Sequence, residues 1–135
     1  MARAPIIRVG RTLIATVHEG LGDQDALFLQ DELGSLLERS STRGVIIDIS
    51  AVETVDSFLG RLLNDVARQS RLLGAHTVLA GMRPAVAITL VELGLQFGGL
   101  HTVLDVDRGM ALLRRLAARD QTRALRGQAL LSRGR

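Results

Sequence analysis

The sequence predicts an α/β fold with a mainly parallel sheet of four to five strands. Residues 44–50, GVIIDIS, form a short continuous apolar run, which is typical of a strand buried on both faces of a parallel sheet. Strand-type runs and helical patterns follow one another in the order β, β, α, β, α, β, α, β, α. Right-handed crossovers would then place about four helices over the sheet.

The first two strands are expected to form an N-terminal β-hairpin. The runs PIIRVG (residues 5–10) and TLIATVH (residues 12–18) are separated only by Gly10 and Arg11. Glycine supplies the backbone conformation that a tight turn between antiparallel strands needs.

Two long helical patterns flank the buried strand. The first begins after Asp23 and Asp25 and ends near Ser40. The second begins at Ser57, repeats leucine and valine at helical spacing, and stops at Gly74, which is expected just past the helix end.

The second half of the chain repeats the strand and helix alternation. Strands are predicted at 76–82 and 101–106, separated by a third helix in which Pro84 suits the first turn and Gly94 weakens the end. A fourth helix is predicted at 107–120.

The third helix is apolar on more than one face, because only Thr89 and Glu92 are polar between Pro84 and Leu95. Such a helix needs two packing partners. Either it is deeply buried in this domain, or one side packs against another protein molecule, since exposed apolar patches mark such interfaces.

Composition indicates one soluble globular domain. The chain has 135 residues, 47% of them hydrophobic, and no cysteine. It shows no apolar run long enough for a signal core or a membrane span, so a cytoplasmic protein is expected. With no cysteine and three dispersed histidines, neither a metal nor another cofactor is expected.

Charge is divided unevenly along the chain. Residues 1–107 hold nine arginines and thirteen acids, net −4, whereas residues 108–135 hold eight arginines and one acid, net +7. Arginine clusters attract RNA, acidic proteins or membrane phosphates. Because no aromatic stacking residue accompanies them, a solvated, partly frayed helical tail is favoured, with no nucleic acid and no membrane as partner.

Polar side chains gather where the parallel strands end. In open α/β sheets, sites form in the loops that leave the carboxyl ends of the strands. Three loops are expected to meet there, and their residues are Gly20, Gly22, Asp23 and Asp25 in the first, Thr54, Asp56 and Ser57 in the second, and Arg83 and Pro84 in the third.

Enzymatic sites find little support at this edge. His76 and His101 start their strands and lie a strand length, about 17 to 20 Å, from Ser57. A dyad of Ser57 with His18 is conceivable, but nothing orients the ring or forms an oxyanion hole. The segment GLGDQD lacks the third glycine of a dinucleotide-binding motif.

Ser57 therefore has two interpretations. A serine before a helical pattern is most often an N-cap. A hydroxyl at a helix N-terminus, beside Asp56, is also a candidate phosphate acceptor, because a phosphoryl group adds about −1.5 to −2 charges and is stabilised by the helix dipole.

Three segments resemble a known family. LGDQDALFLQDEL, GVIIDISAVETVDSFLGRLLNDVARQSRLLGA and TVLAGMRPAVAITLVELGL are similar, in order and spacing, to STAS domains, the family of sulfate transporters and anti-sigma-factor antagonists. Within it they resemble the RsbS-type antagonist of the bacterial stressosome. The resemblance covers residues 4–117. It implies a STAS domain at 1–118, followed by an Arg-rich tail at 119–135 that is partly disordered or helical.

The resemblance also implies a function. Ser57 would be phosphorylated by an RsbT-type serine kinase, which Asp23, Thr54 and Asp56 would help to bind. The unmodified protein would hold this kinase in an oligomer with RsbR-type STAS paralogues, without enzymatic activity of its own, and phosphorylation would release it. The alternative is a STAS accessory subunit of a membrane transporter.

Overall fold

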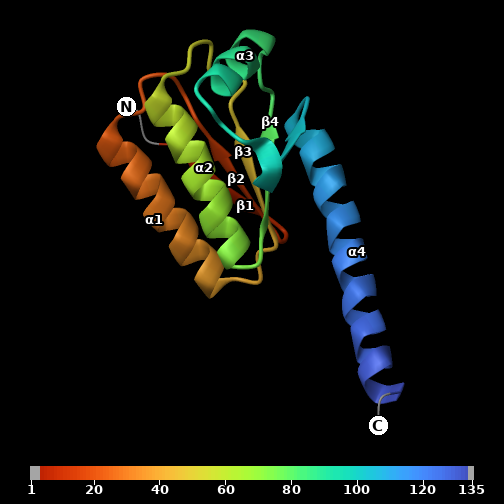
Figure 1. Ribbon diagram of the computed structural model, residues 1–135. Coiled ribbons are helices and arrows are strands. Elements are labelled where there is room, and N and C mark those ends of the chain that lie inside the picture. Colours follow the sequence, from red (N-terminus) through yellow and green to blue (C-terminus); the bar gives the residue numbers. More distant parts are fainter. Residues whose placement is uncertain (1–3, 134–135) are drawn as a thin grey trace.

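A five-stranded sheet forms the centre of the computed structural model, which describes residues 4–133 (Figure 1). The strands lie in sequence order; the first two are antiparallel and each later neighbour pairs in parallel. This confirms the predicted hairpin and the mainly parallel sheet. The strands are β1 (Ile6–Val9), β2 (Thr12–Thr16), β3 (Gly44–Asp48), β4 (His76–Ala80) and β5 (Leu100–Val103).

Helices cover both faces of the sheet unequally. The first two lie side by side on one face, the fourth lies on the other, and the third stands at the carboxyl ends of the strands (Figure 1). The helices are α1 (Asp23–Arg39), α2 (Ser57–Leu72), α3 (Pro84–Glu92) and α4 (Val106–Arg133), with a short 3₁₀ turn at Phe97–Gly99.

The main core lies between the sheet and the pair α1 and α2. Alternate residues of each strand point into it, as the two-residue period of a strand requires. Full burial of one leucine or isoleucine contributes about 1.5–3 kcal/mol. The side chains that are at most 1% exposed there include Leu13, Val17, Leu29, Leu33, Ile47, Ile49, Leu63, Val66 and Leu79.

A smaller core lies on the opposite face, under α4. Ile46, Val78 and Ala80 of the sheet pack there against Leu113. Gly44 permits this close approach, because a Cβ on it would lie 2.7 Å from both terminal methyl carbons of Leu113. The second face of the sheet is therefore closed by a single helix.

The structure decides between the two interpretations of the third helix. Only Val86 and Leu90 of α3 are buried, whereas Ile88 and Val91 are each 61% exposed. Of the two alternatives, deep burial within the domain is therefore wrong. Packing of the exposed side against another protein remains a prediction.

The fourth helix is longer than predicted. It crosses the expected boundary at residue 118 without a break and continues to Arg133, so its C-terminal half extends past the rest of the domain (Figure 1). Every side chain from Ala117 to Arg133 is exposed. No helix among the described residues combines the length and apolar character required to cross a membrane.

Candidate functional site

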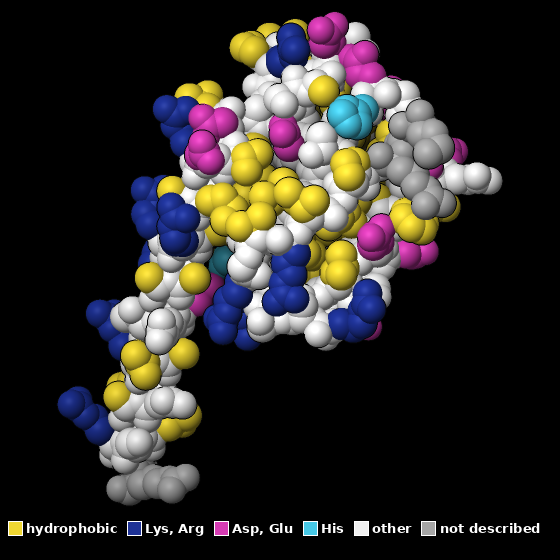
Figure 2. Space-filling view, turned by 180° about the vertical axis from the view of Figure 1, so that it is seen from behind, with side chains coloured by type: hydrophobic (Ala, Val, Ile, Leu, Met, Phe, Trp, Pro, Cys, Tyr) yellow, Lys and Arg dark blue, Asp and Glu magenta, His cyan; other side chains and the backbone are white. Residues whose placement is uncertain are grey.

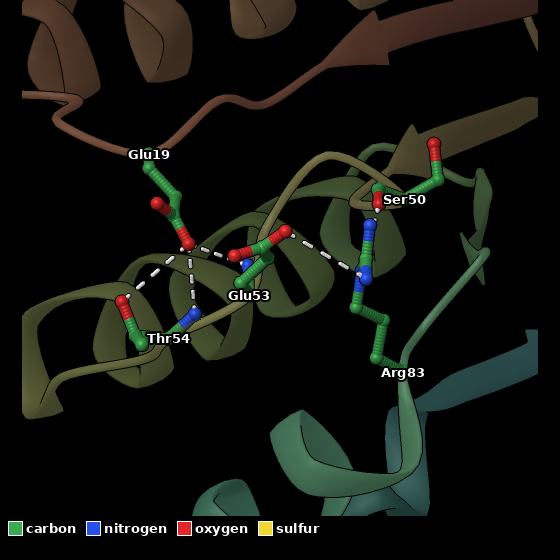
Figure 3. Close-up of polar contacts among 5 residues, drawn as sticks. All are labelled: Glu19, Ser50, Glu53, Thr54 and Arg83. Atoms are coloured by element: carbon green, nitrogen blue, oxygen red, sulfur yellow. Dashed lines mark hydrogen bonds and ion pairs between the residues drawn. The ribbon is translucent and has the colours of Figure 1, made fainter.

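The three predicted loops meet at the carboxyl edge of the sheet, and Glu19 connects the first two (Figure 3). Its Oε1 accepts hydrogen bonds from the backbone N–H groups of Glu53 at 2.6 Å and Thr54 at 2.9 Å, and the Thr54 hydroxyl lies 3.5 Å from the same atom. These bonds hold the loop that leads into Ser57.

The same bonds change the acidity of Glu19. Donation from the backbone N–H of Glu53, and then from that of Thr54, stabilises the carboxylate and lowers the pKa of Glu19 below its ordinary value of 4.5. The connection between the two loops is therefore formed by an ionised carboxylate at neutral pH.

Arg83 connects the third loop to the second (Figure 3). Its Nε donates to the backbone oxygen of Ser50 at 3.2 Å, and its Nη1 lies 3.8 Å from Glu53 Oε1. Gly81 lets the two loops lie close together, because its φ is +77° and a Cβ there would lie 2.7 Å from the Ser50 Cβ. All three loops are thus joined through two charged side chains.

Asp56, and not Ser57, is the N-cap of α2. Its Oδ1 accepts the backbone N–H of Leu59 at 2.9 Å, while Ser57 is the first helical residue. The expectation that Ser57 caps the helix is therefore wrong by one residue. The physical reason is that aspartate is as good a cap as serine, and here it stands one position earlier.

Ser57 is left exposed at the start of α2. Within residues 4–133 no hydrogen-bond partner is found for its hydroxyl group. Because the unpaired N–H groups of a helix's first turn favour negative charge, an anion attached to this hydroxyl would lie in a favourable field.

The residues predicted to bind a kinase are only partly brought together. Thr54 and Asp56 line one hollow of about 230 Å³ with His18 and Phe58. Asp23 begins α1 and is exposed, but it does not line this hollow. Gly22 is the cap residue before it and offers no side-chain cap.

The structure gives the enzymatic alternatives no further support. No hydrogen bond between His18 and Ser57 is found in the described part of the chain, although His18 lines the neighbouring hollow. His76 and His101 lie close to one another on β4 and β5, with ring centroids 5.9 Å apart. Among residues 4–133 no three acidic or histidine side chains are placed to hold a metal ion.

Sequence reasoning missed Glu19 and the backbone of Ser50. Glu19 contacts residues 34 and 35 positions later in the chain, and no local pattern indicates such a pairing. Its position directly after a strand, at the edge where sites form, was the available signal.

Comparison with known proteins identifies the fold family. A model of the STAS domain matches residues 4–108, which is most of the chain. The chain belongs to the STAS domain family. This confirms the predicted family and, with the sheet order and helices described above, the predicted fold.

Among curated proteins, this STAS chain resembles co-antagonists from Bacillus subtilis (strain 168). It is 32% identical over 94 residues to the RsbT co-antagonist protein RsbRD and 29% identical over 108 residues to RsbRA. The matches cover 67% and 79% of this chain but only 34% and 39% of those proteins. The STAS chain thus spans somewhat more than a third of their length.

Solved structures resemble the STAS chain over nearly their whole length. A serine-to-glutamate variant of RsbS from Moorella thermoacetica is 40% identical, with a TM-score of 0.78, and the match covers 86% of this chain and 98% of that one. A chain from a structure described as the molecular architecture of the stressosome, a signal integration and transduction hub, is 41% identical, with a TM-score of 0.76, at 84% and 98% coverage.

Proposed function

We propose that this STAS protein is an RsbS-type regulator that holds a serine kinase in a stressosome-type complex and releases it when Ser57 is phosphorylated. The observation that carries the proposal is the exposed Ser57 hydroxyl at the start of α2. It follows a loop fixed by Glu19, so a kinase would meet it in one defined position.

The charges around Ser57 would turn a phosphoryl group into a switch. Asp56 precedes Ser57, and Glu19 and Glu53 belong to the connected loops. A phosphoryl group adds about −1.5 to −2 charges, so it would increase repulsion from any acidic surface of a bound partner. A hundredfold loss of affinity requires only about 2.7 kcal/mol.

Phosphorylation at this position need not unfold the domain. An anion at an exposed helix N-terminus is stabilised by about 0.3–1 kcal/mol, and Asp56 keeps the cap hydrogen bond to Leu59. The expected effect is therefore on binding, with the fold of the STAS domain retained.

The kinase would dock on the loops at the carboxyl edge of the sheet. Thr54 and Asp56 line the hollow beside Ser57, and Asp23 lies outside it at the start of α1. The proposed kinase is of the RsbT type, because the curated relatives are named as RsbT co-antagonists. The same names and the stressosome structure favour RsbR-type paralogues as the other subunits.

The protein would act through binding alone, in the cytoplasm, where the kinase finds ATP. Neither a cofactor nor a reaction of its own is part of the proposal, because no base is hydrogen-bonded to Ser57 among residues 4–133.

Labelling with an RsbT-type kinase and ATP tests the proposal. Wild type is expected to incorporate one phosphoryl group, and Ser57→Ala none. Ser50→Ala is the matched control, because Ser50 lies in the same loop region, is also exposed and contributes its backbone oxygen to Arg83. Equal labelling of Ser57→Ala and wild type would contradict the proposal.

A further inference from the structure

Beyond Asp120, α4 is a charged helix that forms no ion pair with its own domain among residues 4–133. Helix α4 holds seven arginines and two acids, net +5. Asp120 joins it to the sheet, since its Oδ2 lies 2.8 Å from Nε2 of His76. Beyond that contact the helix extends past the domain (Figure 2).

Arginines form a straight stripe on this extension. Arg119, Arg126 and Arg133 are seven residues apart, so they lie on one helix face. Of the seven arginines in α4, only Arg108 makes an ion pair within the described part of the chain. Leu130, which is 69% exposed, lies on the same side of the helix.

The outer face of α1 carries the opposite charge. Helix α1 holds five acids and one arginine, net −4, and none of these charges forms an ion pair among residues 4–133. Asp23, Asp31 and Glu38 are exposed and follow one line along the helix. Leu27, 61% exposed, lies between the first two.

The two faces cannot meet within one molecule. Helix α1 covers one face of the sheet and α4 covers the other (Figure 1). At 1.5 Å per residue, the acidic line from Asp23 to Glu38 is about 22 Å long and the stripe from Arg119 to Arg133 about 21 Å. Two unpaired helix faces of opposite charge and equal length therefore lie on opposite sides of the same domain.

We propose that the arginine stripe of α4 docks antiparallel along the acidic face of α1 of a second copy of this chain. In this arrangement each of the three arginines lies opposite an acidic residue of α1, and the two exposed leucines contact each other. The contacts are Arg119 with Glu38, Arg126 with Asp31, Leu130 with Leu27, and Arg133 with Asp23.

The leucines determine the direction of the two helices. A parallel arrangement would also pair the charges, but it would place Leu27 opposite Arg123 and Leu130 opposite Ser35. Only the antiparallel arrangement removes both leucines from water together. Each exposed ion pair contributes only a little binding free energy. Joint burial of the two leucines adds a hydrophobic contribution to that of the three ion pairs.

A protein partner fits the extension better than a lipid surface does. The face opposite the arginine stripe includes Ala117, Gln121, Ala124 and Gln128. The exposed Leu125 and Leu131 flank this face, but they are six residues and therefore about 120° apart around the helix, so they form no continuous apolar face for insertion between lipids. Charge complementarity to α1 therefore identifies the second copy as the occupant.

The interface would be heterologous, because it joins two different surfaces of the same protein. Such contacts generate closed rings or open filaments rather than simple two-fold dimers. This assembly shares only Asp23 with the proposed kinase site, so the test below changes Asp31 and Glu38, which lie farther along α1.

Sedimentation velocity on the full chain tests the proposal without any kinase. Association is expected at about 0.01 M ionic strength, where the Debye length is about 30 Å. It should be lost at about 1 M ionic strength, where the Debye length is about 3 Å. The double variant Arg119→Glu with Arg126→Glu is expected to weaken association at least about tenfold. The matched control is Arg61→Glu with Arg68→Glu, which makes the same charge change on exposed positions of α2.

A crossed mixture gives the sharpest result. Asp31→Arg with Glu38→Arg should also lose association alone, and mixing it with the α4 double variant should restore association, because the reversed surfaces match each other. Circular dichroism checks that each variant is folded. An association that is absent, insensitive to salt, equally weakened by the α2 control or not restored in the mixture would overturn the proposal. Binding of wild type to phosphatidylglycerol vesicles without self-association would overturn it too.

Discussion

Glu19 Oε1 accepts the backbone N–H of Thr54 at 2.9 Å, so the loop after β2 holds the loop that presents Ser57. The two residues are 35 positions apart, and their contact makes one surface out of two separate segments. The position of Ser57 therefore depends on an ionised carboxylate as well as on α2.

The Thr54 amide should report the ionisation of Glu19. Folding lowers the pKa of Glu19 below its ordinary value of 4.5. The contribution of its carboxylate to folding stability is therefore complete above pH 4.5 and is lost as the pH falls through the pKa that Glu19 has in the folded protein. In an NMR titration, the Thr54 amide shift is expected to change with a midpoint below 4.5, and Glu19→Gln should remove the change. A midpoint at or above 4.5 would contradict the account.

Alanine substitutions at Asp56 and at Ser57 should have different effects on stability, because only Asp56 caps α2. Asp56→Ala removes the acceptor for the N–H of Leu59 and is expected to cost about 0.5–2 kcal/mol of unfolding free energy. Ser57→Ala, which removes no hydrogen bond, should stay within about 0.5 kcal/mol of wild type. Urea denaturation measures both; a larger loss for Ser57→Ala would restore serine as the cap.

Gly81→Ala should destabilise the loop edge. Alanine at φ +77° costs about 1–2 kcal/mol, and its Cβ would also collide with Ser50. Gly127→Ala is the matched control, because Gly127 lies in the exposed helix with no atom near a new Cβ, and there alanine should stabilise by up to about 1 kcal/mol. Equal effects of the two changes on the urea midpoint would be inconsistent with the close approach of Gly81 to Ser50.

The stability of the protein should fall in mild acid partly through His101. Burial, and then the neighbouring His76, lower the pKa of His101 below 6.5. The unfolded chain therefore binds more protons in the range just below 6.5, and stability decreases as pH falls through it. His101→Gln is expected to lose less stability than wild type between about pH 7.5 and 5.5. Urea denaturation at each pH measures the unfolding free energy. Equal losses in wild type and His101→Gln would show that His101 does not contribute to the pH dependence of stability.

Local patterns were sufficient to predict most of the fold. The apolar run of β3, the glycine at position 74 and the proline at position 84 each correspond to an observed strand or helix boundary. These patterns depend on residues that are close in sequence, so a single sequence is enough to interpret them.

Contacts between distant segments were not predictable in the same way. Glu19 and Ser50 join the site through partners more than thirty residues away, and the cap moved by one residue because two good cap residues stand in sequence. The tail beyond residue 118 was expected to be partly disordered or helical, and α4 continues through it to Arg133. The apolar third helix left two alternatives that only its exposed Ile88 and Val91 could separate.

The affinity of the RsbT-type kinase for the unmodified and the phosphorylated protein tests the central claim most directly. Isothermal titration of both forms, with kinase-treated Ser57→Ala as control, is expected to give about a hundredfold weaker binding for the phosphorylated form alone. The Ser57→Ala protein should bind as tightly as unmodified wild type. Equal affinity of the kinase for the two wild-type forms would contradict the account.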